Sequence, residues 1–275
     1  VLQDAGVDEA AACASLLRVM GLGDREPVVT DVEDLTRLLV FDAGPGVSVV
    51  GSITAGWENA RGVRQVISSE MWECINATHL GLPRLASPER SAPPHLLFQW
   101  VKERAAMLAG LAETTMSHDD AWRFMVLGRS LERVDMTARL LSARLAEGWG
   151  DAGWATTLRC CSAYEAYLRT FRPPVDGATA ARFLLADDLF PRSVLAALRR
   201  AEECLALLDP VAPRRVGEAA RILGLARTEI EFLGVPELLD ALPGRLERVQ
   251  RHGTAASRVI SERFFRRNAI LEWVA

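Results

Sequence analysis

The sequence predicts an all-α protein, a single multi-helix bundle of about ten to twelve helices spanning residues 1–275. Two observations lead to this prediction. Apolar residues recur at helical spacing along most of the chain, and only the segment 47–53 (VSVVGSI) is dense in β-branched residues. An isolated strand without a partner is not stable, so we assign that segment to the start of a helix. No composition shift or long linker divides the chain, and we therefore expect one domain.

The first helices are delimited by capping residues and glycines. Asp8 stands at the N-cap of a helix over 8–20, which ends in a glycine-rich turn. Valine and leucine at helical spacing predict a second helix over 31–41, and the sequence AGPG after it breaks the pattern. We expect a third, long helix over 47–80, with Ser48 as its cap.

The middle of the chain holds a proline-rich loop and the longest predicted helix. Prolines and serines predict a surface loop over 83–94, followed by a helix over 96–114. Ser117 and Asp120 then resemble a capping box, which predicts that a central helix begins there and continues to Glu147.

Shorter helices fill the rest of the chain. Proline and glycine separate most of them, and Pro191 fits the first turn of the helix that follows it. We expect them over the ranges 154–170, 179–186, 192–208, 214–232, 236–251 and 254–275.

The charge balance and the hydropathy argue against two classes of partner. The formal net charge is −4 at pH 7, whereas a nucleic-acid-binding protein is expected to carry a basic excess. No apolar run approaches the ~18 residues that a membrane helix needs, and the first residues lack signal-peptide character. We therefore expect a cytoplasmic protein that binds neither nucleic acid nor a membrane.

The cysteines and the short motifs predict no metal and no cofactor. Five cysteines occur without a Cys-x-x-Cys pair, and the adjacent Cys160 and Cys161 point in different directions on a helix. We expect reduced, mostly buried thiols. No P-loop, HExxH or dinucleotide-binding glycine pattern occurs. The residues therefore name no reaction.

Two arginines of the central helix lie on a face that is otherwise apolar. At 100° per residue, Arg129 and Arg133 share a stripe with Trp122, Val126, Met136 and Leu140, nearly opposite the expected core stripe. A helix that is apolar on two sides is enclosed by neighbours, so we expect both arginines to be at least partly buried. An unpaired buried charge costs several kcal/mol, and the arginines therefore need partners. Glu132 lies within reach of Arg129.

The best acidic partners precede the proline-rich loop. Glu70, Glu73 and Asn76 follow one another at i,i+3 spacing, shortly after Arg64, and so share one face of a helix. We predict that Glu70 and Glu73 pair with Arg129 and Arg133 across two packed helices.

Two interpretations of this polar group remain open. It is either a buried ion-pair network that fixes helix register or a pocket that holds a carboxylate or phosphate bidentately. His118, with Trp122 after it, stands at the start of the central helix. There His118-Asp119-Asp120 indicates capping rather than metal binding, although helix N-termini attract anions. Weaker candidates resemble ordinary interhelical contacts or a cap, namely Tyr164, Glu165, Asp187 and Asp188. Ser193 lacks the Gly-x-Ser-x-Gly context of a nucleophilic serine.

Four phrases follow one another along the chain, namely RGVRQVISSEMWECIN, SHDDAWRFMVLGRSLERVDMTARLL, CCSAYEAYLR and FLLADDLFPRSV. Together they closely resemble the α-E domain proteins, a family of bacterial all-helical proteins named for a Glu-Arg motif, which falls here on Glu132-Arg133. The resemblance implies an association with circularly permuted ATP-grasp ligases and transglutaminase-like proteins. It therefore implies a role in making or modifying a peptide or amide-linked product, and it supplies no established catalytic residue.

The beginning of the chain departs from that family. Its members usually start with a helix that carries its own Leu-Gly-Arg-x-x-Glu-Arg phrase, similar to residues 127–133, and VLQDAG carries none. We therefore expect a domain that lacks its first helix or that was excised from a longer protein.

Three functional hypotheses follow. The first is an accessory or binding module for an ATP-grasp ligase, holding an acidic peptide, a phosphate-bearing ligand or the partner itself. The second is an enzyme of peptide synthesis or modification, with Glu70 or Glu73 as acid or base beside the arginines. The third is a purely structural polar cluster.

Overall fold

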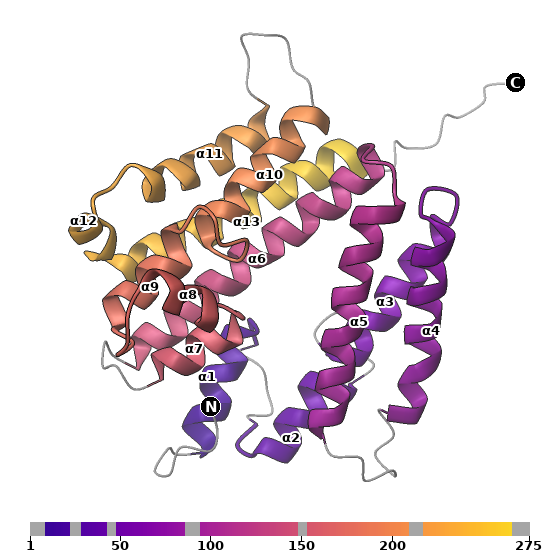
Figure 1. Ribbon diagram of the computed structural model, residues 1–275, viewed down its shortest axis with the longest axis horizontal. Coiled ribbons are helices and arrows are strands. Elements are labelled where there is room, and N and C mark those ends of the chain that lie inside the picture. Colours follow the sequence, from indigo (N-terminus) through magenta and orange to yellow (C-terminus); the bar gives the residue numbers. More distant parts are fainter. Residues whose placement is uncertain are drawn as a thin grey trace, which may run out of the picture. The chain divides into compact units, whose positions relative to one another are not determined.

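The computed structural model describes residues 9–22, 29–42, 48–85, 94–147, 153–208 and 217–265 (Figure 1). Within these ranges it contains thirteen α-helices, two short π-helical turns and no strand. The all-α prediction is confirmed.

The chain divides into two compact units, residues 2–123 and 124–275, which we call the N-terminal and C-terminal units. The boundary falls inside helix α6 (Asp120–Ala146), between Arg123 and Phe124. The expected single domain over 1–275 stays a prediction.

The N-terminal unit contains five complete helices. They are α1 (Glu9–Val19), α2 (Val32–Thr36, continued by the π-helical turn Arg37–Phe41), α3 (Val49–Gly62), α4 (Ser69–Leu85) and α5 (Pro94–Thr115). Cys13, Leu17 and Leu35 form a small core between α1 and α2, and α4 packs against both α3 and α5. Gly81 of α4 permits the close contact with α5, because a Cβ at this position would lie 3.0 Å from a ring atom of Trp100.

The single helix predicted over 47–80 is wrong, because the segment forms α3 and α4. Ser48 caps α3 as expected, accepting a hydrogen bond of 2.8 Å from the amide of Gly51. The chain leaves helical geometry after Gly62, and Ser68 accepts a bond of 3.1 Å from the amide of Met71 at the start of α4. Pro83, expected to open the loop, lies instead in the last turn of α4, which ends at Leu85.

The C-terminal unit contains most of α6 and seven further helices. They are α7 (Trp154–Cys160), α8 (Tyr164–Thr170), α9 (Gly177–Ala186), α10 (Val194–Leu208), α11 (Glu218–Glu231), α12 (Val235–Leu239) and α13 (Leu242–Ile260, continued by a π-helical turn over Ser261–Phe265). Its core is built from large, fully buried side chains, among them Trp154, Tyr167, Leu198, Leu223 and Leu246. Helix α11 packs against both α10 and α13.

Three predicted helix boundaries in this unit are wrong. The helix expected over 154–170 is broken between α7 and α8, where Ser162 adopts a left-handed conformation with φ of 53°. Ala241, with φ of 52°, separates α12 from α13 in the same way, and α13 runs without a break past Gly253. Pro191 precedes helix α10 instead of opening it.

Helix α6 begins at Asp120, but its cap is Asp119. The Asp119 carboxylate accepts hydrogen bonds from the amides of Ala121 and Trp122, at 3.0 and 3.3 Å, so the predicted Ser117 capping box is wrong. The fully buried stripe of α6 lies between the two predicted apolar faces and includes two hydroxyl residues, Ser130 and Thr137. Its other members are Val126, Leu127, Val134, Ala138 and Leu141.

Candidate functional site

The candidate site begins with a row of residues on α6. Arg129, Arg133 and Thr137 follow one another at four-residue steps and so lie along one side of the helix. Both arginines are half-buried, as predicted, and Thr137 is 5% exposed. Glu132 is exposed, and no ion pair joins it to Arg129 in the described part of α6.

A third arginine joins the row from a distant part of the chain. The hydroxyl of Thr137 donates a hydrogen bond of 3.1 Å to the backbone carbonyl of Arg192, in the loop between α9 and α10. This bond places Arg192 beside the row formed by Arg129 and Arg133. We call Arg129, Arg133 and Arg192 the arginine cluster.

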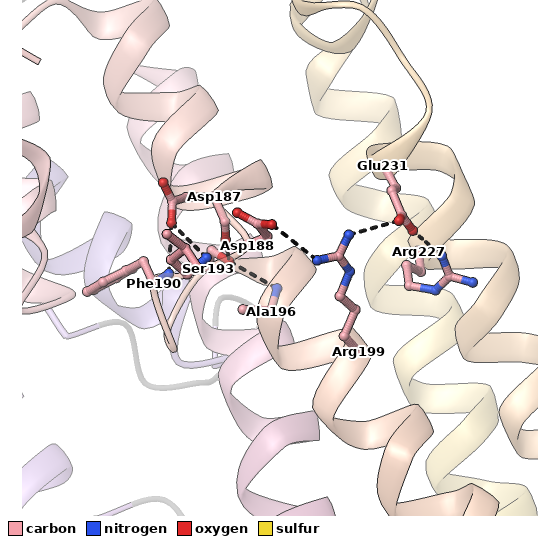
Figure 2. A network of polar contacts seen from close by, with 9 residues as sticks. Asp187, Asp188, Phe190, Ser193, Ala196, Arg199, Arg227 and Glu231 are labelled. Carbon is pink, nitrogen blue, oxygen red and sulfur yellow. Dashed lines mark hydrogen bonds and ion pairs between the residues drawn. The ribbon is translucent and has the colours of Figure 1, made fainter. Parts of the chain in front are cut away.

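The loop that carries Arg192 is held by bonds within itself (Figure 2). The Asp187 carboxylate accepts from the amides of Leu189 and Phe190, at 3.0 and 2.7 Å. The hydroxyl of Ser193, which is fully buried, donates to the Asp187 carbonyl and accepts from the amide of Ala196 at 3.0 Å. The loop therefore presents Arg192 from a fixed backbone.

Packing and ion pairs anchor the same loop to its neighbours. The ring of Phe190 packs on Phe183 of α9, with centroids 5.2 Å apart. Asp188 pairs with Arg199 of α10 at 3.5 Å, and Arg199 pairs in turn with Glu231 of α11 at 2.8 Å (Figure 2). Arg227 also pairs with Glu231, and it binds Glu202 of α10 at 2.5 Å.

The arginine cluster carries positive charge that its own unit leaves uncompensated. Burial lowers the pKa of Arg133, and the charges of Arg129 and Arg192 lower it further. Among the described residues of the C-terminal unit, no carboxylate forms an ion pair with any of the three arginines. The acid nearest in sequence that forms an ion pair, Asp135, is bound by Arg139 at 2.7 Å.

Cys161 adds no compensating charge. It caps the end of α7 and is 6% exposed. Burial raises the pKa of its thiol to about 12, Cys160 adds to the rise, and the positive charge of Arg192 acts against it. The thiol is therefore neutral at physiological pH, and a neutral thiol is a poor nucleophile.

The arrangement is suited to anion binding. Each guanidinium is a planar fork of N–H donors that matches the oxygens of a carboxylate or phosphate. Like charges close together repel, and partial burial strengthens the repulsion, so an anion between them would relieve it.

The acidic residues predicted to pair with these arginines lie in the N-terminal unit. Glu70 and Glu73 are exposed on α4, and their pairing with Arg129 and Arg133 stays a prediction. Asn76, expected on the same face, accepts a hydrogen bond of 3.0 Å from the indole of Trp57. Arg64 lies over the ring of Trp72, 4.4 Å from its centroid.

The remaining predicted residues have local structural contacts. His118 stacks on Trp122, with ring centroids 3.9 Å apart, at the start of α6. Tyr164 lies beneath the guanidinium of Arg159, 4.5 Å from it, and Glu165 is exposed. Asp187 and Asp188 act as a cap and an interhelical contact, as the simpler interpretation expected. Ser193 bonds to the backbone at the start of α10.

Arg192 is the member of the cluster that sequence reasoning missed. A single arginine after Phe190-Pro191 has no periodic pattern, and its relation to α6 depends on a contact between residues 55 positions apart. Its one available signal was that FPRS lies inside a phrase that resembles the family.

The described residues contain neither a candidate metal site nor a candidate membrane-spanning helix. No group of three or more histidine, cysteine, aspartate or glutamate side chains is arranged to hold a metal ion. No helix there combines the length and apolar character that crossing a membrane requires.

Fold and site together define an all-helical protein with a cationic cluster on its longest helix. A family model for a predicted α-helical domain with a conserved ER motif matches residues 1–265. The chain therefore belongs to the α-E family. No curated protein and no solved structure matches the chain.

The Glu-Arg dipeptide occurs five times in the sequence, at positions 89, 103, 132, 247 and 262. We assign the family motif to Glu132-Arg133 because it lies within the phrase LGRSLERVD that carries the resemblance. Arg133 is also set apart physically. Arg248, for comparison, is paired with Glu229 at 2.8 Å, whereas the pKa of Arg133 is lowered by burial and by neighbouring cations.

Proposed function

We propose that this α-E protein is a binding module that holds an anionic ligand on the arginine cluster and works beside an ATP-grasp-type peptide ligase. The observation that supports anion binding is the meeting of Arg129, Arg133 and Arg192 with no carboxylate partner among the described residues of their own unit. The ligand is an acidic peptide or a phosphate-bearing group.

A comparison within the same unit favours binding over a purely structural role. Arg199 and Arg227 lie in a network where each guanidinium has carboxylate partners, Glu231 above all. Such a network ties helices together. The arginine cluster has the cations of a network without its acids, and like charges at i,i+4 spacing destabilise a helix.

The neighbouring polar groups favour binding over catalysis. The hydroxyls of Thr137 and Ser193 both donate to backbone carbonyls. The Cys161 thiol is neutral. These groups position the loop and leave the guanidiniums as the groups that meet a ligand.

The proposed partner rests on the family resemblance. The resemblance implies an association with circularly permuted ATP-grasp ligases and transglutaminase-like proteins, and an ATP-grasp ligase activates a carboxylate as an acyl phosphate. A module that holds such a group would either pass it to the ligase or keep it away from the ligase.

Titration calorimetry on the full chain tests anion binding, with inorganic phosphate and a tri-glutamate peptide as probes. Arg133→Met keeps the length of the side chain and removes the charge. It is expected to weaken binding of the preferred probe at least about tenfold. Arg221→Met, which removes an exposed arginine of α11 in the same unit, is the matched control and is expected to bind as the native protein does. Absence of binding to both probes would overturn the proposal.

Copurification with the neighbouring ATP-grasp ligase tests the partnership separately. A stable complex, or a change in the ligase products when the α-E protein is omitted, is the expected result. Unchanged products together with no complex would leave an anion-binding module without that partner.

A further inference from the structure

The three arginines of the cluster present more positive charge than one carboxylate neutralises. The hydrogen bond from Thr137 holds the backbone of Arg192 beside the α6 row of Arg129 and Arg133. Burial and the charges of both neighbours lower the pKa of Arg133. Among the described residues of the unit, no carboxylate forms an ion pair with any of the three. A single carboxylate carries one negative charge and accepts one bidentate fork. A phosphoryl group carries about −1.5 to −2 charges at pH 7 and offers three strong acceptor oxygens.

We propose that the ligand of the arginine cluster presents a phosphoryl group, and that Arg192 is the residue that selects it over a carboxylate. This inference rests on the proposed anion-binding function and names its ligand class. Arg129 and Arg133 come from one side of a helix, and Arg192 comes from a separate element, so the three forks approach an anion from two directions. A tetrahedral oxyanion offers acceptor oxygens in several directions, whereas a carboxylate accepts hydrogen bonds best near its own plane.

The electrostatics agree with the geometry. The pKa of Arg133 is lowered by its own burial and by the charges of both other arginines, so all three groups act on one region. The charge of Arg192 also extends to Cys161, whose neutral thiol provides no counter-charge. A dianion in that region is favoured over a monoanion, because it offsets two of the three positive charges instead of one.

The loop that carries Arg192 is organised before any ligand arrives. Asp187 and Ser193 bond to its backbone, Phe190 packs on Phe183, and Thr137 holds the Arg192 carbonyl. Within this loop, binding therefore requires ordering of only the Arg192 side chain, which keeps the entropic cost of binding low. The Arg192 side chain is exposed, so a ligand can reach it from solvent.

Two sources supply a phosphoryl group, free phosphate and the acyl phosphate of a ligase intermediate. Calorimetry on the full chain with inorganic phosphate and with acetyl phosphate separates them. Acetate and succinate are the comparison ligands at equal ionic strength in chloride buffer, succinate being a dianion of similar charge whose two carboxylate groups are each planar. Both phosphoryl probes are expected to bind at least about tenfold tighter than succinate. Tighter binding of acetyl phosphate than of phosphate assigns the acyl phosphate, and the reverse order assigns free phosphate.

The variants assign the selectivity to Arg192. Arg192→Met is expected to reduce the preference for phosphate over succinate to less than about threefold, while Arg221→Met keeps it. Circular dichroism and thermal melts confirm that Arg192→Met is folded, as expected for an exposed side chain. Arg192→Lys, which keeps the charge without the fork, is expected to retain only part of the preference.

Each failure has a separate meaning. Succinate binding as tightly as phosphate, or an unchanged preference in Arg192→Met, overturns the assignment of a phosphoryl ligand. In that case the tri-glutamate peptide still binding in an Arg133-dependent manner leaves the proposed function standing. If no anion binds the native chain, both are overturned.

Discussion

Thr137 of α6 donates a hydrogen bond to the backbone carbonyl of Arg192, at 3.1 Å and across 55 positions of sequence. The two residues come from different phrases of the sequence, SLERVDMTAR and FPRSV. Arg133 lies one turn before Thr137 on the same side of α6. The bond therefore holds the backbone of Arg192, in the loop, close to Arg133 of the Glu-Arg motif.

Replacing Thr137 by valine tests that connection. Valine keeps the shape of the side chain but has no hydroxyl. The Arg192 carbonyl therefore loses a partly buried hydrogen bond. We expect the free energy of unfolding in urea to fall by about 1 kcal/mol and phosphate affinity to fall several-fold. Thr228→Val removes an exposed hydroxyl that bonds only locally, to the carbonyl of Leu225, and is the control. Equal behaviour of the two variants would argue against a positioning role for Thr137.

Arg133→Met separates a binding site from a structural network by its effect on stability. Burial and two neighbouring cations lower the pKa of Arg133, so its charged form is less favoured in the folded protein than in the unfolded chain. Neutralising it therefore removes a cost at neutral pH. We expect the free energy of unfolding to stay equal or to rise by up to about 1 kcal/mol, while anion binding is lost. A loss of several kcal/mol in chemical denaturation would instead indicate a structural ion pair.

Local signals predicted most of the helices and their caps. Ser48 caps α3, as its position before an apolar helical run indicated. The apolar stripes on two opposite sides of the central helix predicted the partial burial of Arg129 and Arg133. These features depend on residues within one or two turns of each other, and such distances are visible in a sequence.

The features that sequence reasoning missed depend on contacts or backbone states without a local signal. The left-handed conformations of Ser162 and Ala241 break helices at residues that ordinarily continue them. Arg192 reaches the cluster through Thr137, and no periodicity connects the two. For the same reason the pairing of Glu73 with Arg133 was inferred from chemistry alone.

The acid network beside the loop predicts a pH dependence of stability. Hydrogen bonds from Arg199, and then from Arg227, hold the pKa of Glu231 below its ordinary value of 4.5. A depressed carboxyl pKa contributes stability that is complete above the unfolded value and is lost as the pH falls through the lower folded value. Glu231→Gln is expected to cost about 1 kcal/mol at pH 7, after allowance for solvent screening, and its difference from the native protein is expected to shrink below pH 4.5.

Urea unfolding measured from pH 7 to pH 3 checks this expectation. Glu203→Gln, which removes an exposed i,i+3 pair with Arg200, is the control and is expected to change little. A constant difference between Glu231→Gln and the native protein over the whole range would contradict the assigned pKa direction.

The cysteines predict a simple labelling pattern. Cys160 is exposed, whereas Cys13, Cys74, Cys161 and Cys204 are buried, as the sequence predicted for most of them. The pKa of Cys161 is raised to about 12, so at pH 8 only about one part in ten thousand of it is thiolate. A disulfide-exchange reagent is therefore expected to label Cys160 rapidly in the native protein and the buried thiols only on unfolding. Cys160→Ser should abolish the rapid phase, and a rapid phase that survives would place a second reactive thiol at the surface.

The predicted pair between Glu73 and Arg133 is testable by a double-mutant cycle. Glu73 is exposed, so a pair with Arg133 is expected to contribute a coupling free energy of only about 0.5–1 kcal/mol. The native protein, Glu73→Gln, Arg133→Met and the double variant are compared by urea unfolding. The carboxylate and a bound phosphate would compete for the same guanidinium, so Glu73→Gln is also expected to raise phosphate affinity. Glu113→Gln, an exposed acid of α5, should do neither. A coupling energy near zero together with unchanged affinity would show that the acids of α4 belong to no site with Arg133, and that its counter-charge comes from the ligand.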